Sequence, residues 1–221
     1  MTIHNYFGDW WNILDKDETL KIIAWLKTLN YNTLCPKVEN VFKAFKSCSY
    51  NKCRLIIISQ DPYPQKNIAT GLAFANTDRV ISPSLKVIRD SVCNFDNPYK
   101  SYIFDPTMNY WAEQGVLLLN SALTTEVNKV GVHVLKWSNF MIKFLKNMSL
   151  YSPGIVYILF GKQAQALKPY INSNNYIFEE YHPAYYARCN KELPNKLWKD
   201  INTILYKLNG SKIKWLKEIN I

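Results

Sequence analysis

Polar residues stand at or just after the ends of four predicted strands of this 221-residue sequence, three of them continuously apolar. In chain order, the runs and their polar neighbours are RLIIIS (54–59) before Gln60 and Asp61, VLLLN (116–120) ending in Asn120, IVYILF (155–160) before Gly161 and Lys162, and YIFEEY (176–181) before His182 and Pro183. An aspartate and a histidine can transfer protons or stabilise charge, and an asparagine amide both donates and accepts hydrogen bonds. Together they would supply a carboxylate, an imidazole and an amide for bond cleavage.

The sequence lacks the signatures of several common enzyme classes. It contains no GxSxG elbow, which disfavours a serine hydrolase, and no P-loop or GxGxxG motif, which disfavours nucleotide-cofactor chemistry. The five cysteines lack paired CxxC spacing, so we expect free thiols and no metal site. Two nearby aromatic rings, Tyr63 and Phe74, complete a set that suits a planar heterocycle. A ring can stack on it, an amide can read its edge, and polar groups can cleave its bond.

Each polar residue taken alone also has a structural explanation. An Asp after a strand is often a turn residue, an Asn can cap the next segment, and a single His is usually structural or exposed. The functional interpretation therefore depends on their coincidence at successive strand ends.

The elements that would position these residues alternate along the chain. The runs 54–59, 116–120 and 155–160 are short and continuously apolar, as expected for strands buried on both faces of a parallel sheet, and the more polar run 176–181 is expected at an edge. Helical patterns cover ETLKIIAWLKTL (18–29), SPSLKVIRDSVCNF (82–95), LKWSNFMIKFLKNM (135–148), KQAQALKPYI (162–171) and NKLWKDINTILYKL (195–208). This order predicts an α/β fold in a single domain, with a central four-stranded parallel sheet flanked by helices on both faces.

A parallel sheet would bring the polar residues together. The carboxyl ends of its strands meet at one edge, which is where open α/β sheets bind ligands. Pro62 and Pro64, on either side of Tyr63, indicate that the loop after the first strand is held in one shape. We therefore expect one rigid crevice at this edge.

Composition indicates the kind of partner. The chain has 27 Lys and Arg against 17 Asp and Glu, a formal charge of +10, which favours a polyanion such as nucleic acid, although AT-rich coding sequence also produces Lys-rich chains. No apolar run is long enough to cross a membrane, and the N-terminal MTIHNYFGDWW does not have the order of a signal peptide. We expect an intracellular protein without a membrane partner.

Several motifs resemble those of one known family. They are QDPYP (60–64), GLAFA (71–75), SPSL (82–85), WAEQGVLLLNSALT (111–124), ILFGKQAQ (158–165) and HPAYYA (182–187). In this order they are similar to the motifs of the family 1 uracil-DNA glycosylases, as are PKVENVFKAF (36–45) and IKW (213–215). The resemblance runs from about residue 36 to the end, so residues 1–35 are a weakly matched helical segment of a single domain spanning residues 1–221.

The resemblance implies an activity and a substrate. These enzymes hydrolyse the N-glycosidic bond between uracil and deoxyribose after base flipping and leave an abasic site, as the first step of base excision repair. It also implies a metal-independent enzyme without cofactor, a monomer that acts on uracil-containing single- and double-stranded DNA. Nothing in the sequence identifies a protein inhibitor or a replication partner.

Two residues match the family's catalytic groups. Asp61 matches the carboxylate that activates water and stabilises the oxocarbenium-like sugar. His182 matches the histidine that hydrogen-bonds uracil O2, where negative charge grows as the base departs.

Four further residues match the groups that bind the base. Asn120 matches the amide that accepts from N3–H of uracil and donates to O4, a pattern that cytosine reverses. Phe74 matches the ring that stacks on the base, and Gln60 matches a residue whose backbone helps to bind it. Tyr63 matches the ring that occupies the space of a thymine methyl group. In an accommodating pocket, one methyl group changes the binding free energy by only ~1–3 kcal/mol.

The sequence departs from the family pattern at three positions near the site. Ser59 replaces the usual Gly before Gln60, and Pro64 replaces the His that commonly follows the tyrosine. The loop that pushes a Leu into the duplex reads HPAYY here, which places Tyr186 at the wedge position.

Contacts to the DNA backbone are also implied. Ser84 matches one of the serines with which the family contacts the DNA backbone. Lys162 and Ala184 stand where the family has further serines. Phosphate binding is therefore expected to depend more on charge and less on hydroxyl groups. The residues expected to contact DNA are Ser84, Lys162, Pro183, Ala184, Tyr186 and Arg188.

Two alternative functions remain at this point. One is a non-catalytic DNA-binding or replication accessory protein on the same scaffold, although binding alone would not need Asp61, Asn120 and His182 together. The other is a glycosylase with a different base preference, which Tyr63 and Asn120 disfavour.

Overall fold

The centre of the molecule is a four-stranded parallel sheet with the strand order β4-β2-β6-β7. The computed structural model describes residues 3–77, 81–96 and 102–218. The strands of the sheet are β2 (Leu55–Ser59), β4 (Val116–Asn120), β6 (Val156–Phe160) and β7 (Tyr176–Glu180). All four predicted strands are confirmed, with ends that differ by one residue at most from the apolar runs.

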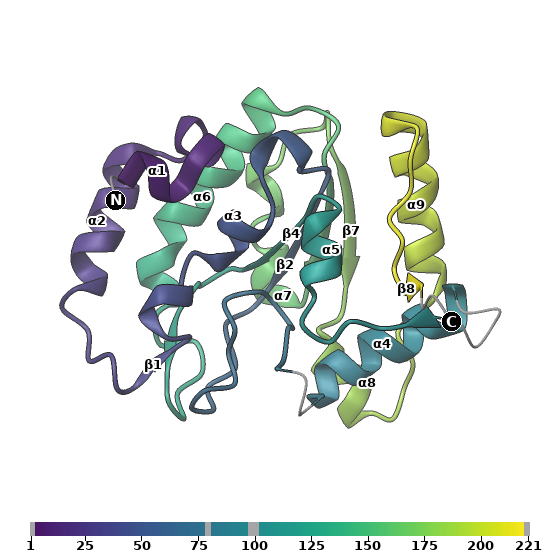
Figure 1. Cartoon of the computed structure of the whole chain (residues 1–221), viewed down its shortest axis with the longest axis horizontal. Coiled ribbons are helices and arrows are strands. Elements are labelled where there is room, and N and C mark those ends of the chain that lie inside the picture. Colours follow the sequence, from purple (N-terminus) through teal and green to yellow (C-terminus); the bar gives the residue numbers. More distant parts are fainter. Residues whose placement is uncertain (1–2, 78–80, 97–101, 219–221) are drawn as a thin grey trace.

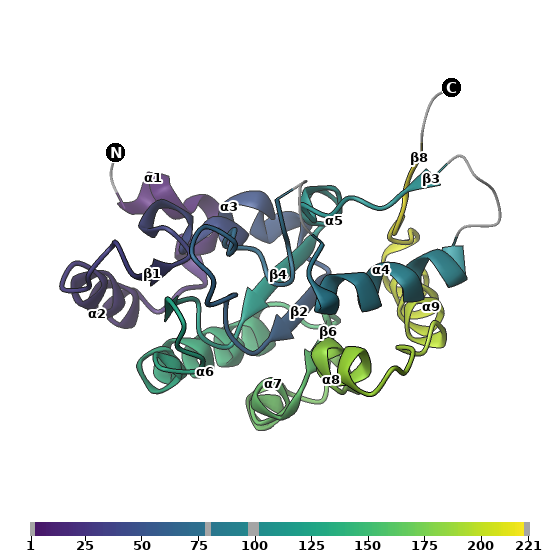
Figure 2. The same ribbon diagram turned by 90° about the horizontal axis from the view of Figure 1, so that it is seen from below.

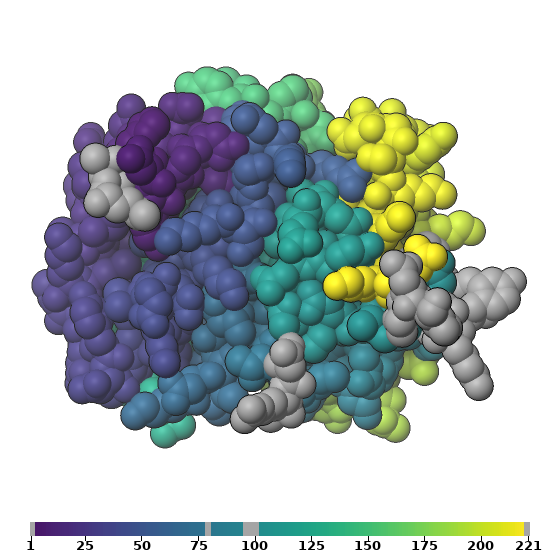
Figure 3. Space-filling view, in the orientation of Figure 1, coloured from purple at the N-terminus to yellow at the C-terminus, as the bar shows by residue number. Residues whose placement is uncertain are grey.

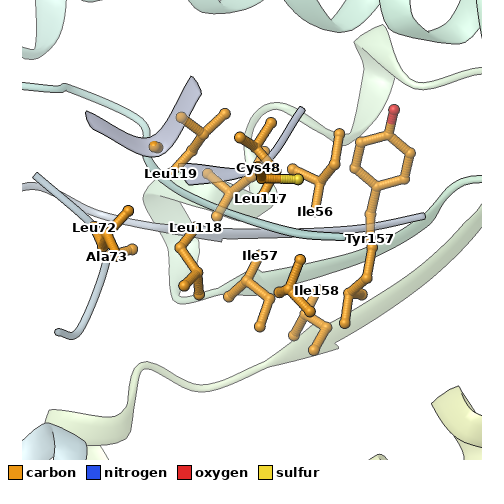
Figure 4. Packing of buried hydrophobic residues seen from close by; sticks show 14 of the residues in the cluster. Cys48, Ile56, Ile57, Leu72, Ala73, Leu117, Leu118, Leu119, Tyr157 and Ile158 are labelled. Atoms are coloured by element: carbon orange, nitrogen blue, oxygen red, sulfur yellow. The ribbon is translucent and has the colours of Figure 1, made fainter. Parts of the chain in front are cut away.

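Burial of the strands follows their composition. Every residue of β2, β4 and β6 is buried, and Figure 4 shows Ile56, Leu117 and Tyr157 on one face of the sheet and Ile57 and Leu118 on the other. Burial of each large apolar side chain stabilises the fold by about 1.5–3 kcal/mol relative to its exposure to water. These strands are therefore stable only when both faces of the sheet are covered. β7 is partly exposed and lies at the edge, as its polar sequence predicts.

The strand register brings the carboxyl ends of the strands together. Ile57 of β2 lies between Leu118 of β4 and Ile158 of β6, and the last residue of β2, Ser59, is paired with Asn120. The segments that leave β2, β4, β6 and β7 therefore start at the same edge of the sheet.

Helices surround this sheet. They are α1 (Ile3–Phe7), α2 (Lys16–Leu26), α3 (Lys43–Ser47), α4 (Pro83–Asp96), α5 (Asn109–Glu113), α6 (Val134–Tyr151), α7 (Lys162–Gln165), α8 (Pro183–Arg188) and α9 (Lys196–Asn209). Both ribbon views place α2 and α6 on one side of the sheet and α9 on the other (Figures 1 and 2). Two-stranded pairs β1 (Leu34–Cys35) with β5 (Thr125–Glu126) and β3 (Tyr102–Ile103) with β8 (Lys217–Glu218) lie outside it. Short 3-10 helices η1 to η4 cover Gly8–Asn12, Val38–Asn40, Tyr50–Lys52 and Lys168–Tyr170.

Local sequence accounts for most helix boundaries. Ser82 caps α4, because its Oγ accepts from the backbone N–H of Leu85 at 3.2 Å. The apolar stripe predicted within 135–148 is buried on α6. The helix predicted over 162–171 is wrong as a single element: α7 ends at Gln165, and Pro169 lies in the separate turn η4.

The N-terminal segment shares the central core. Phe7, Trp10 and Ile22 belong to the same buried cluster as the strands, and Trp10 Nε1 donates to the Cys48 carbonyl at 2.7 Å. Figure 3 shows the N-terminal segment in purple and the C-terminal segment in yellow at opposite ends of one face. Within the described ranges, no helix is both long and apolar enough to cross a membrane.

Candidate active site

A cavity of about 400 Å³ opens at the carboxyl edge of the sheet. Nine of the twelve predicted site residues line it: Gln60, Asp61, Tyr63, Phe74, Ser84, Asn120, His182, Ala184 and Arg188. The remaining three are Lys162, Pro183 and Tyr186, which do not line it. Every residue expected to touch the base or the sugar therefore lines the cavity. The three predicted residues that do not line it are ones expected to contact the rest of the DNA.

Asp61 is fixed by a backbone group from another loop. Its Oδ2 accepts from the N–H of Gly131 at 2.6 Å, and the N–H of Asn128 in the same loop donates to the Pro64 carbonyl at 2.9 Å. Burial raises the pKa of the Asp61 carboxyl above its usual value, and the Gly131 N–H opposes this shift by stabilising the ionised form. Because Gly131 holds Oδ2, Oδ1 is the oxygen that can act on a ligand.

The ring of Tyr63 is held at its hydroxyl. This hydroxyl donates to the Phe74 carbonyl at 3.1 Å and lies 2.6 Å from Ser82 Oγ. Since the phenol proton goes to Phe74, the Ser82 hydroxyl donates to the tyrosine oxygen. Burial raises the pKa of Tyr63 to about 12, partly offset by the contact with Ser82. The phenol stays neutral, and the ring forms a wall that two neighbours hold in place.

Phe74 takes an unusual backbone conformation. Its φ is +64°, and its side chain is buried edge-on against Phe160, with ring centroids 5.4 Å apart. The turn before it needs glycine, because a Cβ on Gly71 would overlap the carbonyl oxygen of Asn40. This constrained turn positions Phe74, which lines the cavity.

Asn120 and Gln60 lie where β2 and β4 end. The Gln60 carbonyl accepts from Ser121 Oγ at 2.6 Å and from the Ala122 N–H at 3.2 Å, which joins the two strand exits. Because both acceptor sites of this carbonyl are occupied, the N–H is the backbone group of Gln60 that could serve a ligand. Asn120 is 7% exposed and lines the cavity, and its amide makes no hydrogen bond within the part of the chain that the structure describes. That amide is the group able to read a ligand edge.

The hydrogen bonds of His182 define its tautomer. The residue caps α8, and its Nδ1 accepts from the backbone N–H of Ala184 at 3.2 Å. Nδ1 therefore carries no proton, and the proton of the neutral ring is on Nε2. Nε2 lies 3.1 Å from Ser59 Oγ, so the imidazole donates toward Ser59. The ring presents a donor at the cavity.

Burial keeps this imidazole neutral. It lowers the pKa of His182 to about 4, with a further contribution from the positive charge of Arg188. The ring also needs a glycine beside it: a Cβ on Gly161, whose φ is +85°, would lie 3.0 Å from His182 Cβ. The position that precedes Lys162 thus serves the packing of the histidine.

The predicted DNA-contacting residues divide into two groups. Ser84, in the first turn of α4, lines the cavity together with Ala184 and Arg188 of α8. Lys162 is exposed at the start of α7, Pro183 is buried at the start of α8, and neither residue lines the cavity. Contact of Lys162 with DNA stays a prediction.

The structure does not present Tyr186 as a wedge. The HPAYY segment is expected to be a loop, but residues 183–188 form α8, which turns this side chain toward the core. Tyr186 is 7% exposed, and its hydroxyl donates to Glu180 Oε2 at 2.7 Å. Insertion into DNA would require the ring to leave this packing and the hydroxyl to give up its acceptor.

Sequence reasoning missed three groups that shape the site. The Gly131 N–H that holds Asp61 has no sequence signal, because a backbone donor can come from any residue. The contact of Ser82 with Tyr63 is hidden behind its capping role, since one hydroxyl serves both. Ser59 is visible as a departure from the family pattern, but its position against His182 needs the fold.

The arrangement suits the removal of a planar, neutral ring from a sugar. A rigid aromatic wall, a stacking ring and an unpartnered amide can select the ring, and a neutral imidazole donor can stabilise negative charge on it. The carboxylate, two residues beyond β2, can act on a water or on a cationic sugar. Among the described residues, no group of three or more His, Cys, Asp or Glu could hold a metal ion.

Comparisons with known proteins agree with this chemistry. The model of the uracil DNA glycosylase superfamily matches residues 45–205. A uracil-DNA glycosylase of Mycoplasmopsis pulmonis is 34% identical over 214 residues, covering 95% of this chain and 90% of that protein, and one of Bacillus thuringiensis is 31% identical over 224 residues, covering 96% and 97%. The crystal structure of mimivirus uracil-DNA glycosylase has the same fold, with a TM-score of 0.74 at 20% identity over 97% of this chain and 93% of that chain.

Proposed function

The chain belongs to the uracil DNA glycosylase superfamily, and on this premise we propose how its own residues carry out the reaction. The protein excises uracil from DNA by hydrolysing the N-glycosidic bond, which leaves an abasic site for base excision repair. A non-catalytic accessory role is not favoured, because the curated relatives that cover the chain are enzymes. The proposal concerns which residue performs each step.

The base is selected by three side chains. Uracil enters the cavity flipped out of the strand and stacks on Phe74, and the Asn120 amide pairs with its N3–H and O4. The Tyr63 ring lies where the methyl group of thymine would be. Its hydroxyl is held by Phe74 and Ser82, so the ring cannot move aside without losing two hydrogen bonds. The support for this step is that all three side chains line one cavity.

His182 stabilises the departing base. As the bond between C1′ and N1 breaks, its electron pair moves onto uracil and negative charge grows on O2. The Nε2–H of the neutral imidazole donates to that oxygen. The tautomer needed for this is the one that the Ala184 N–H imposes by donating to Nδ1. Because the ring is neutral before uracil arrives, it donates a hydrogen bond and transfers no proton.

Asp61 acts on the sugar side. Its carboxylate lies below the ribose, stabilises the oxocarbenium-like sugar and accepts the proton of the attacking water as oxygen bonds to C1′. The family's usual His is replaced by Pro64, so the Gly131 N–H is the group that orients the carboxylate in this chain. One oxygen of Asp61 is thereby fixed and the other is directed to water.

DNA binds along the rim of the cavity as a substrate of a monomeric enzyme. Ser84 and Ala184 line the rim near the N-terminal turns of α4 and α8, and Arg188 and Lys162 add positive charge for phosphates. Both single- and double-stranded DNA fit this scheme, because the base is read only after it has left the stack. The reaction as proposed uses no metal or cofactor and takes place inside the cell.

The observation that carries the proposal is the convergence of Asp61, Asn120 and His182 on one cavity of about 400 Å³. The test is single-turnover excision from oligonucleotides with one deoxyuridine, in EDTA, followed by alkaline cleavage of abasic sites. Asp61→Asn and His182→Ala should each slow excision by about 10²–10³-fold. Lys199→Ala, which changes an exposed residue of α9, is the control and should leave the rate unchanged. Full activity of both site variants would refute the assignment.

A further inference from the structure

Ser59 has an unexplained position in the site. It is the last residue of β2 and is 2% exposed, yet it lines the cavity, and its Oγ lies 3.1 Å from His182 Nε2. This is the histidine atom that faces uracil O2 in the proposed reaction. The family pattern has glycine at this position, so the hydroxyl is a feature of this chain.

The protons of this contact can be assigned. The Ala184 N–H donates to Nδ1, so Nε2 carries the ring proton and donates to Ser59 Oγ. Ser59 is therefore the acceptor, and its own hydroxyl proton is not used in this hydrogen bond. No other partner for this hydroxyl occurs among residues 3–77, 81–96 and 102–218. Since Ser59 lines the cavity, that proton can point toward a bound ligand.

We propose that Ser59 is a catalytic residue, a second hydrogen-bond donor to uracil O2 beside His182. The inference rests on the proposed function, because it places O2 next to His182 Nε2. When O2 arrives, the Nε2–H and the Ser59 O–H both turn to it. The bond from C1′ to N1 breaks with its electron pair moving to the base, and the two donors share the charge that reaches O2. Ser59 transfers no proton and forms no covalent bond.

Loss of the hydroxyl should slow the chemical step. We expect Ser59→Ala to reduce the single-turnover rate of uracil excision about tenfold, as for one neutral hydrogen bond of ordinary strength. The affinity for uracil-containing DNA should stay the same, because the extra charge on O2 exists only as the bond breaks. A thermal melt of each variant checks that the fold is intact. Ser59→Gly, the family's residue, should behave like Ser59→Ala.

Two further arms separate direct donation from a role through His182. In a His182→Ala background, Ser59→Ala should still lower the rate several-fold, because its donor acts on uracil itself. With 5-fluorouracil, a better leaving group that needs less stabilisation of O2, the loss caused by Ser59→Ala should be smaller than with uracil. His182→Ala alone, in the same assay, reports on the proposed site.

The rates of the Ser59→Ala and His182→Ala variants decide between these possibilities. A tenfold loss that persists without His182 and shrinks with 5-fluorouracil supports the proposal. An unchanged or faster Ser59→Ala enzyme overturns it, as does a loss that vanishes in the His182→Ala background or is equal for both bases. If His182→Ala is itself fully active, the proposed site fails; if only Ser59→Ala is, this inference fails alone.

A separate observation concerns two tyrosines next to the cavity. Tyr181 is 60% exposed, and its ring stacks on Tyr185, with centroids 4.6 Å apart and an interplanar angle of 29°. Lys191 Nζ lies 6.0 Å from the Tyr185 ring. The pair flanks His182 in sequence, and Tyr186 on the same helix is buried.

We infer that the Tyr181–Tyr185 pair is a stacking surface for the bases beside the flipped uracil. An exposed aromatic face next to a positive charge is the usual means of holding unpaired bases, at ~1–3 kcal/mol per base. The pair lies in continuity with the cavity through His182 and Ala184, which line it. In this proposal the tyrosine pair holds the bases beside the gap that the flipped uracil leaves. The family pattern places its wedge residue in that gap.

The test uses a single-stranded oligonucleotide with 2-aminopurine next to deoxyuridine. Tyr181→Ala and Tyr185→Ala should each weaken binding about tenfold and abolish the fluorescence quenching that stacking produces. Tyr206→Ala is a matched control, since Tyr206 is 58% exposed and also has a lysine near its ring, Lys212 at 5.7 Å, but belongs to α9. Equal losses in all three variants, or none in the first two, would refute the inference. A loss confined to Tyr186→Leu would also refute it and support the wedge.

Discussion

The protonation of His182 allows a quantitative prediction. Burial lowers its pKa from the ordinary value of about 6.5 to about 4 in the folded protein, and unfolding restores the ordinary value. Above pH 6.5 the ring is neutral in both states and contributes no pH dependence. Between pH 6.5 and 4 the unfolded chain binds a proton that the folded protein does not bind. The stability of the fold is therefore lost as the pH falls through this window.

The size of the effect follows from the shift. A change of about 2.5 pKa units, at roughly 1.4 kcal/mol per unit, corresponds to at most about 3.5 kcal/mol of unfolding free energy. Residual contact with water at the cavity reduces this figure, so we expect about 2 kcal/mol. Asp61 acts in the opposite direction, because its carboxyl pKa is raised in the folded state, and its contribution must be removed by comparison.

The assay is urea unfolding of the wild type and of His182→Asn at pH 7.5, 6, 5 and 4. Asn Oδ1 occupies the position of His Nδ1 and can still accept from the Ala184 N–H, so the helix cap is kept, while the titrating group is lost. The difference in unfolding free energy between the two proteins should move by about 2 kcal/mol against the wild type on acidification. Parallel curves for the two proteins would refute a buried neutral imidazole. So would a His182 pKa near 6.5, measured by NMR in the folded protein.

The site leads to three other predictions. Tyr63→Ala should gain thymine excision, because removal of the ring opens space for the methyl group, whose exclusion is worth ~1–3 kcal/mol of discrimination. Release of thymine from a G·T oligonucleotide measures this gain. Asn120→Asp should gain cytosine excision, since a protonated carboxyl presents the donor and acceptor that cytosine needs; uracil-only activity in both variants would mean that the base pocket is misassigned. DNA affinity, measured by fluorescence anisotropy, should fall about tenfold between ~50 and ~200 mM salt if two phosphates are neutralised, and a flat response would remove the role of Arg188 and its neighbours.

The sequence predicts the scaffold well because burial leaves a strong pattern. Strands such as β2 and β6, with every residue buried, can only be continuous apolar runs, and a parallel sheet then brings their carboxyl ends together. Asp61 lies two residues beyond β2, Asn120 ends β4 and His182 lies two residues beyond β7, so their convergence depends on topology alone. That is why the inner site can be predicted from residue order.

The outer site depends on details that residue order does not contain. The short helix α8 turns the Tyr186 ring into the core, whereas Tyr181, which precedes the helix, is exposed. The partner of Asp61 is a backbone N–H of Gly131, 70 residues away along the chain, and no side-chain motif encodes it. Such features arise from loop geometry, which a resemblance between motifs does not transmit.

A crystal structure of the protein with free uracil would show directly whether the cavity binds the base. We expect uracil in the cavity, stacked on Phe74, with O2 within hydrogen-bond distance of His182 Nε2 and the N3 and O4 edge toward Asn120. Uracil bound elsewhere, or bound in the cavity with O2 turned away from His182, would contradict this expectation.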